Sequence, residues 1–553
     1  MLRIKKWFDS GTPYIWMNAG AVSISIIMVV GLIYLIAVRG LSHFWPADIA
    51  VFDYYAEPEA PKERLIAEFA DEETVSRSRA GNPKYEGDFI KRDLIKMGNR
   101  DITGLDFKWI LNAGIENKTY PNEVMVIERR EWGNLYGFLV GLNINGNKIT
   151  ENNLFWSTFQ NRIEESNNIF DEIRHIEKDL IGAINYKMER LRLDERSLEL
   201  NQQKTPENLI ILEDKRRELK EKYDALVNEL EKLYTELNSS SFTVKIADGQ
   251  EKTFQFSKIV RAVKPNAMNK LDKIRHYFEK LWEFFSDDPR EANTEGGIFP
   301  AIFGTVLMVI IMAIIVTPFG VIAAVYLREY APQGPTTRFI RIAVNNLAGV
   351  PSVVYGVFGL GFFVYFLGGS IDELFFPEAL PAPTYGTPGL LWASLTLAIL
   401  TVPVVIVATE EGLSRVPREI REGSLALGAT KAETMWLTVL PMTAPAMITG
   451  LILAIARAAG EVAPLMLVGV VKMAPSLPLD GNAPFLHLDR KFMHLGFHIY
   501  DVGFQSPNVE AARPLVYATS FLLIVLIVAL NMVAIHIRNN LREKYKSLSL
   551  IHI

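Results

Sequence analysis

Cysteine is absent from the 553 residues of this chain, which excludes disulfide bonds, thiolate-bound metals and a cysteine nucleophile. The chain also lacks a Gly-x-x-x-x-Gly-Lys-Ser/Thr segment, the loop that holds the phosphates of ATP in many ATPases. If ATP drives this protein, another chain must bind it. The chain also lacks a large excess of positive charge, since its net charge is −5. This argues against nucleic acid as the main partner.

Apolar residues make up 49% of the chain, yet charged residues still make up 22%. This balance predicts a membrane part and a water-exposed part in one polypeptide. A membrane helix needs about 20 mostly apolar residues, and six stretches meet this requirement. They are residues 17–38, 300–327, 342–367, 389–409, 442–471 and 515–537.

Basic residues lie in every second connection between these stretches, and this alternation predicts the topology. Arginine and lysine gather on the cytoplasmic loops of membrane proteins. Six spans with both termini cytoplasmic satisfy this rule, and they place loop 410–441 in the cytoplasm and residues of about 44–294 outside. The basic residues are Arg3, Lys5, Lys6, Arg328, Arg338, Arg341, Arg415, Arg418, Arg421, Lys431, Arg538, Arg542, Lys544 and Lys546.

The long outer segment has the composition of an α+β domain. Apolar residues recur on three- and four-residue steps over about 160–238, which predicts an antiparallel coiled-coil hairpin. Thr205 and Pro206 suit the start of its second helix. Strand-like runs flank this arm, and Asp248-Gly249 suits a hairpin turn. The runs are residues 106–111, 123–128, 136–144, 242–246 and 253–263.

An apolar helical face covers residues 268–285, just before the second apolar stretch. Such a face can lie on the membrane surface, as interfacial helices do. It can equally pack on the neighbouring β-rich domain, and this second interpretation is the preferred one.

Loop 410–441 is the most informative segment, because its residues predict two short helices set at an angle. Pro417 suits a first helical turn, and Gly428 supplies a left-handed stop. Thr430 and Glu433 then form a capping box that restarts the chain. Leu440-Pro441 is expected to end the second helix at the membrane.

This loop resembles the EAA loop of ABC importer permeases, which docks into a groove on a separate ATPase subunit. An ordinary helix-turn-helix in a loop is the alternative. The resemblance rests on the spacing of Glu422, Gly423, Ser424, Gly428, Leu440 and Pro441.

Two charged residues, Arg457 and Glu461, fall within the fifth apolar stretch. Charges at membrane depth are costly, so they face the protein interior or a water-filled path and find partners. Their spacing of four residues predicts a pair on one helical face. One interpretation is a structural salt bridge. The other is a guanidinium presented to an oxyanion, because its planar fork matches tetrahedral anions and never loses its charge.

Four segments are similar to the PstA-type permease subunits of phosphate importers, over residues 294–540 and more loosely over 1–45. The insertion at 46–293 lies beyond the resemblance, as in a long form of the family. The segments are EGGIFPAIFGT at 295–305, AGVPSVVYGVFG at 348–359, VPREIREGSLALGAT at 416–430 and LAIARAAGEVAPL at 453–465.

The resemblance implies the type I ABC importer permease fold in a bacterial inner membrane. It also implies a PstC-type permease partner, two copies of a PstB-type ATPase that binds ATP, a periplasmic phosphate-binding protein and surrounding membrane lipids. No catalytic residue, metal ligand or cofactor site is expected in this chain. The expected parts are 1–43 with the first span, 44–294 outside, 295–540 as the permease domain and 541–553 as a cytoplasmic tail.

Two alternatives remain open at this point. One is a permease of the same architecture for another oxyanion, such as sulfate or molybdate. The other is a membrane signalling protein whose outer coiled-coil domain acts as a sensor.

Overall fold

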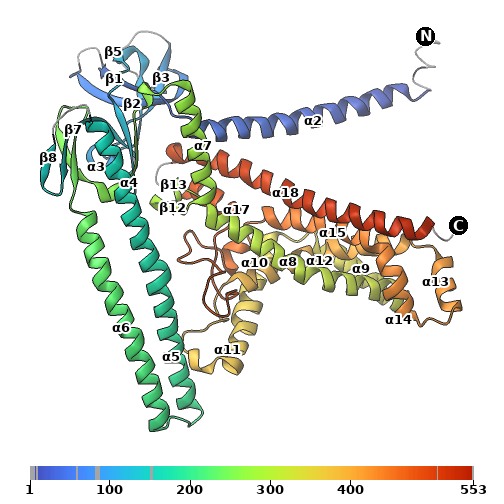
Figure 1. Ribbon diagram of the computed structural model, residues 1–553. Coiled ribbons are helices and arrows are strands. Elements are labelled where there is room, and N and C mark those ends of the chain that lie inside the picture. The colour runs from blue at the N-terminus through green and yellow to red at the C-terminus, as the bar shows by residue number, and fades with distance from the viewer. Residues whose placement is uncertain are drawn as a thin grey trace.

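The computed structural model describes residues 7, 10–57, 60–80, 88–149, 154–506 and 509–550. Figure 1 shows a bundle of long helices and, across one end of it, a region of β-strands with two further long helices. The expected N-terminal cations Arg3, Lys5 and Lys6 lie outside the described residues, as do residues 551–553 of the expected tail.

Six helical segments are long and apolar enough to cross a membrane, as the sequence predicts. These candidate spans are Thr12–Phe44, Phe299–Tyr330, Ser352–Phe375, Leu390–Arg415, Lys431–Gly460 and Ala512–Leu541. Their α-helices are α2 (Thr12–Leu41), α8 (Phe299–Val325), α10 (Ser352–Phe358), α11 (Gly369–Phe375), α12 (Leu390–Arg415), α14 (Lys431–Glu433), α15 (Leu440–Gly460) and α18 (Val509–Leu550).

Two of the predicted stretches have wrong limits. Residues 342–367 do not form one helix, because α9 (Pro335–Leu347) ends before Pro351 and the span begins at Ser352. Proline lacks a backbone N–H and disfavours a helical conformation in the residue before it. Residues 442–471 are also divided, since α15 ends at Gly460 and only the short α16 (Leu465–Val468) follows.

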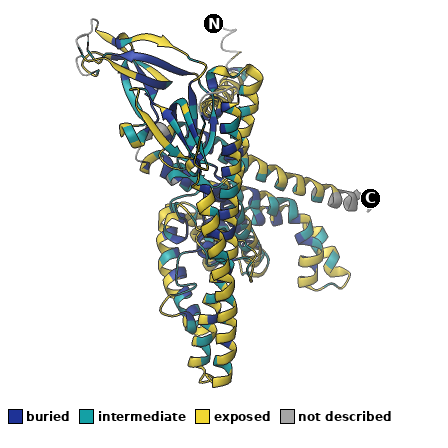
Figure 2. Ribbon diagram, turned by 60° about the vertical axis from the view of Figure 1, so that its left-hand side comes forward, coloured by how far each residue is buried: buried dark blue, intermediate teal, exposed yellow. Residues whose placement is uncertain are grey.

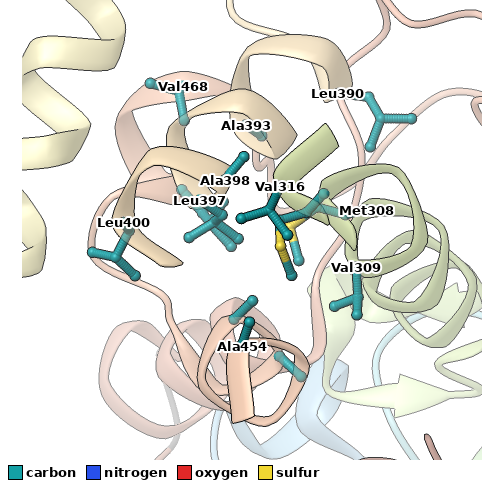
Figure 3. Close-up of a cluster of buried hydrophobic side chains, with 14 of the residues drawn as sticks. Met308, Val309, Val316, Leu390, Ala393, Leu397, Ala398, Leu400, Ala454 and Val468 are labelled. Atoms are coloured by element: carbon teal, nitrogen blue, oxygen red, sulfur yellow. The ribbon is translucent and has the colours of Figure 1, made fainter. Parts of the chain in front are cut away.

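The core of the bundle lies between α8, α12 and α15 (Figure 3). Met308 and Val309 of α8 meet Leu397 of α12 and Ala454 of α15, and all four are buried. A Cβ atom on Gly450 of α15 would lie 2.6 Å from the Cβ atom of Ala408. Small residues therefore let α12 and α15 approach closely, which is the usual basis of helix association in membranes.

In the described residues, the chain before α8 contains two large antiparallel sheets and a two-stranded one, in which β12 (Pro289–Arg290) pairs with β13 (Glu295–Gly296). The first has the strand order β4-β3-β2-β1-β5, and the second has the order β10-β9-β7-β6-β11 with β8 paired to β7. The strands of the first are β1 (Ile49–Tyr54), β2 (Glu63–Ser76), β3 (Phe89–Lys96), β4 (Phe107–Leu111) and β5 (Ile115–Thr119). Those of the second are β6 (Met125–Arg129), β7 (Leu135–Ile144), β8 (Asn147–Ile149), β9 (Ser241–Lys245), β10 (Glu251–Gln255) and β11 (Ile259–Val263).

Strands 4, 6, 7 and 9 lie where the sequence predicts them, and Gly249 turns the chain between β9 and β10 with φ 84°. The run 253–263 is broken, because a 3₁₀ turn (Phe256–Lys258) separates β10 from β11. Strands β1, β2 and β3 were not predicted. β1 is buried along its whole length, so it shows no alternation of apolar and polar residues.

Two long helical segments leave the second sheet side by side (Figure 1). The outgoing segment is α4 (Phe155–Arg174), a π-helical stretch (His175–Ile181) and α5 (Gly182–Leu200), and the returning one is α6 (Pro206–Leu237). Thr205 caps α6 by accepting a hydrogen bond from Asn208 N. Tyr186 of α5 donates to the carbonyl of Ala483 at 2.6 Å, so the pair is held against the loop after α16.

The interpretation that the apolar face of α7 (Lys270–Ser286) packs on the β-rich region is wrong. The charged face of α7 packs on the β-rich region instead, because Lys280 Nζ lies 2.7 Å from Glu128 Oε1 of β6. Leu271, Phe278 and Trp282 are exposed by 76%, 61% and 72%. This exposure suits the alternative, in which the face lies on the membrane surface. Figure 2 shows that many residues of the spanning helices are exposed as well.

Buried charges fasten the inserted region to the start of the bundle. Glu128 accepts from Lys280 and, at 2.6 Å, from Arg290, which also contacts Glu283 at 2.7 Å. Burial opposes ionisation of Glu128, but the charges of Lys280 and Arg290 lower its pKa. Nearby Glu295 has no such partner among the described residues, and burial raises its pKa to about 7.

We expect Glu295→Gln to stabilise the protein at pH 8 but not at pH 5. The carboxyl ionises near pH 4.5 when unfolded and near pH 7 when folded, so wild-type stability falls as the pH rises through this interval. Glutamine removes that dependence. Thermal unfolding in detergent should show a gain of several degrees at pH 8. Equal gains at both pH values would contradict the assignment, and Glu291→Gln, which removes a partner of Arg100, should instead lower the midpoint.

Candidate translocation site and coupling loop

Arg457 and Glu461 lie together where α15 ends. Arg457 is in the last turn of the helix, whereas Glu461 follows it with an extended backbone (φ −79°, ψ 133°). Arg457 Nε and Glu461 Oε1 are 3.6 Å apart. The structure thus brings the two side chains together, but the expectation that both lie on one helical face is wrong.

The guanidinium of Arg457 has unused hydrogen-bonding capacity. A separation of 3.6 Å is too long for a hydrogen bond, and no other acceptor contacts this side chain within the part of the chain that the structure describes. Its side chain is 32% exposed. A charged group inside a helical bundle that lacks an acceptor is costly to maintain, so its free donors are available to a ligand.

The chain is tightly packed around this helix end. Gly356 of α10 lies against the break, because a Cβ atom there would be 2.7 Å from Cα of Pro464. Ala454 and Ala458 are fully buried on α15. The Tyr355 hydroxyl, within electrostatic reach of Arg457, donates to the carbonyl of Leu347 at 2.6 Å. These contacts set the position of Arg457 between α15, α16 and α10.

Loop 410–441 contains the two helices expected from its sequence. The first is α13 (Arg418–Ala426), and Gly428 then turns the chain with φ 90°. The second begins at Lys431 with a complete capping box: Thr430 Oγ1 accepts from Glu433 N, and Glu433 Oε2 accepts from Thr430 N at 2.7 Å. A contact of 2.9 Å between Ser424 Oγ and Thr434 Oγ1 joins the two helices.

Two details of the loop differ from the expectation. Pro417 is the residue before α13 and not part of its first turn. Leu440-Pro441 does not end the second helix, which continues from Lys431 to Gly460. A π-helical stretch (Thr434–Val439) directly precedes Pro441, and its altered hydrogen-bond pattern accommodates a residue without an N–H.

Basic residues that served only to predict topology hold this loop in place. Arg421 donates to the carbonyl of Leu413 at 2.5 Å and pairs with Glu329 at 3.2 Å. Lys431 donates to the backbone carbonyl of Glu329. Arg341 pairs with Glu410 at 3.2 Å. The loop is therefore joined to the ends of α8 and α12 by directed contacts.

The outer surface of the loop is exposed and carries a large apolar side chain. Leu427 is 91% exposed, and Glu422, Gly423 and Gly428 are exposed beside it. Sequence reasoning missed Leu427, although an isolated leucine directly before the turning glycine was a usable signal. Leu440 is buried by contrast and Pro441 half-buried, so these two residues pack within the protein.

Comparisons with known proteins place residues 316–546 in one family, described as "Binding-protein-dependent transport system inner membrane component". The chain is 30% identical over 237 residues to "Probable ABC transporter permease protein YqgI" of Bacillus subtilis, over 42% of this chain and 74% of that protein. The chain belongs to this family. It is a multi-pass membrane permease of the ABC class, and it has no catalytic role of its own.

Two further proteins are similar to part of this chain. The permease is 38% identical over 194 residues to "Phosphate transport system permease protein PstA" of Mycobacterium leprae, over 35% of this chain and 58% of that protein. A chain of the MetNI methionine ABC transporter aligns over 94% of its length and 44% of this permease, with 18% identity and a TM-score of 0.32. The loop and Arg457 fall inside the matched segment, and the inserted region falls outside it.

We expect Gly428→Pro to disrupt the turn between the two short helices of the coupling loop, residues 410–441. Proline fixes φ near −65°, whereas Gly428 has φ 90° and donates to the carbonyl of Leu425 at 3.0 Å. Hydrogen exchange of residues 418–436 should become faster in the purified permease. Gly423→Ala is the matched control, because a Cβ atom at Gly423 meets no atom within 4 Å. Unchanged exchange in the proline variant would show that the corner does not depend on this residue.

Proposed function

We propose that this permease forms the path of an ATP-driven phosphate importer, with Arg457 as a contact for the substrate. The free guanidinium carries the proposal, since it lies between helices with donors that no described residue uses. An arginine fork matches a tetrahedral oxyanion and stays charged at physiological pH. The relative from Mycobacterium leprae is named for phosphate transport, which supports the same substrate.

Glu461 favours phosphate over sulfate or molybdate. A carboxylate 3.6 Å from the guanidinium repels a fully ionised anion. Phosphate at neutral pH still carries a proton, and its O–H group can donate to the carboxylate. Sulfate has no such donor, so it leaves Glu461 both unpaired and repelled. The pair therefore suits a partly protonated oxyanion.

The assembly that we infer has four kinds of subunit. A PstC-type permease completes the path, two PstB-type ATPase copies bind ATP, and a periplasmic phosphate-binding protein delivers the substrate. The exposed face of α13 with Leu427, together with Glu422, Gly423, Ser424 and Gly428, suits a groove on the ATPase. Leu440 and Pro441 support this face from the helix behind it.

The proposed topology has both termini in the cytoplasm of a bacterium and six spans in its inner membrane. Residues 1–43 hold the first span, and about 44–294 form a periplasmic domain with a coiled-coil arm at about 160–238. Residues 295–540 form the permease domain, and 541–553 form a cytoplasmic tail. The apolar cluster of Ile173, Ile176, Leu230 and Leu237 between the two long helices supports the coiled-coil interpretation.

In the proposed cycle, ATP binding closes the ATPase pair and moves α13 with it. The continuous helix from Lys431 to Gly460 carries that movement to Arg457. The site binds phosphate weakly, because capture belongs to the binding protein and tight binding here would slow release. The family match over residues 316–546 favours transport over the signalling alternative.

We expect Leu427→Asp to abolish association with the ATPase while the loop stays folded. The side chain is 91% exposed, so the change places a charge in the proposed interface without disturbing the fold. Co-purification of the ATPase measures association, and hydrogen exchange checks the loop. Leu105→Asp, at an exposed leucine of the inserted region, is the control for an added charge. An ATPase that stays bound to the Leu427 variant would remove this leucine from the interface.

The substrate assignment is tested by Arg457→Gln combined with Glu461→Gln. The double change leaves no uncompensated charge, so the complex should assemble. Phosphate uptake into proteoliposomes should fall at least about tenfold, since a charged hydrogen bond contributes about 1.5–3 kcal/mol. Basal ATPase activity should remain.

Glu461→Gln alone should narrow the preference for phosphate over sulfate in the same assay. Near-normal phosphate uptake by the assembled double variant would contradict a substrate role for Arg457 and leave the pair a structural salt bridge. Sulfate or molybdate uptake exceeding that of phosphate in the wild-type complex would overturn the choice of oxyanion.

A further inference from the structure

The helix α7 lies where two candidate spans reach the inserted region. The ring of Phe44, the last residue of the first span, is 5.0 Å from the ring of Phe284, measured between centroids. Ile298, directly before the second span, donates its backbone N–H to the carbonyl of Phe284 at 2.9 Å. Figure 1 shows α7 running across the direction of α2 and α18. Contacts with two spans therefore hold α7 crosswise at the level where the apolar segments end.

Only one side of α7 is directed to the β-rich region. Lys280 reaches Glu128 of β6 on that side, with 2.7 Å between Nζ and Oε1. Phe278 and Trp282 are each two residues from Lys280, which corresponds to about 200° around a helix of 3.6 residues per turn. These two aromatic side chains consequently point away from the β-rich region.

The side of α7 opposite Lys280 carries a stripe of large apolar residues. Leu271, Ile274, Phe278 and Trp282 recur at steps of three and four residues, so they share one face of the helix. All four are exposed. A contiguous apolar surface of this kind marks a contact with a membrane or with another protein.

Aromatic residues around α7 indicate which of these two contacts applies. Trp45 directly follows the first span and is 46% exposed. Its ring lies 6.1 Å from the ring of Tyr277 of α7, and Trp282 is on the same helix. Tryptophan and tyrosine are enriched at the boundary between hydrocarbon and water. The stripe is also next to the end of α2, whose apolar side chains are exposed along the span. A lipid surface therefore continues from α2 to α7.

We propose that α7 is an interfacial helix whose stripe of Leu271, Ile274, Phe278 and Trp282 lies among the phospholipids of the adjoining leaflet. Basic residues at the edge of the apolar face are typical of such helices, and Lys270 and Arg275 are exposed there. The inserted region is thus attached to the lipid surface as well as to the bundle. This second attachment fixes its orientation relative to the membrane.

The absence of native cysteine allows the proposal to be tested with single spin labels on the full chain in phospholipid nanodiscs. Labels are placed with Phe278→Cys and Trp282→Cys. The ratio of accessibility to oxygen over accessibility to a water-soluble nickel chelate should be high at both positions. Val29→Cys, at an exposed residue of α2, is the lipid control. Lys148→Cys is the water control, because β8 lies on the side of the inserted region away from α7 (Figure 1).

Labels at Phe278 and Trp282 that behave like the label at Lys148 would overturn the proposal. Labels that exclude both reagents would also overturn it, because they would show that protein covers the stripe. The measurement is repeated on the complex extracted from native membranes, where exclusion of both reagents would identify a partner subunit as the occupant.

A second variant tests whether the aromatic residues hold the helix in the lipid. Phe278→Asp combined with Trp282→Asp places two charges in the stripe, and charges are costly in lipid. The accessibility ratio of a label at Leu271→Cys should then fall to that of Lys148, whereas Phe278→Leu with Trp282→Leu should leave it high. Unchanged hydrogen exchange of β6 checks that the variants fold. A high ratio in the folded aspartate variant would contradict the proposed role of these side chains.

Discussion

One uninterrupted helix connects the coupling loop to the charged pair, and the remaining geometry of the bundle depends on it. Arg457 lies 26 residues after Lys431 within this helix, which is about 39 Å at 1.5 Å per residue. Because an α-helix transmits displacement along its axis, the loop and the charged pair are mechanically joined. The π-helical stretch Thr434–Val439 and Pro445 are the points where bending is easiest.

The inserted region is attached firmly enough to respond to movement of the bundle. Phe44 and Phe284 belong to the same buried cluster as Leu495 of α17 (Leu495–Tyr500) and Leu515 of α18. Asn293 donates to the carbonyl of Lys472 at 2.7 Å. Apolar packing, directed hydrogen bonds and the Glu128 network therefore act at one boundary. A change in the spacing of the first and sixth spans would strain the apolar cluster, which contains Phe44 and Leu515.

The sequence could predict the features that depend on local chemistry or on long apolar runs. Six candidate spans follow from hydropathy, and the corner of the loop follows from Gly428 with the capping box of Thr430. The limits of the third and fifth spans depend on tertiary packing, since apolar composition continues through Pro351 and Pro464 where the helices break. β1 was missed because it is buried on both faces and lacks the period of two.

The sequence correctly predicted that Arg457 and Glu461 lie close together, but the helical geometry assumed for the pair was wrong. A spacing of four residues suggested a helical ion pair, but Glu461 lies beyond the helix and reaches within 3.6 Å of Arg457 through an extended backbone. A helical Glu461 would be fixed by intrahelical hydrogen bonds, so separating it from Arg457 would require a rotamer change or unwinding. Outside the helix, the carboxylate can shift with its loop. Since the contact is longer than a hydrogen bond, an incoming oxyanion can take the guanidinium donors without first breaking one.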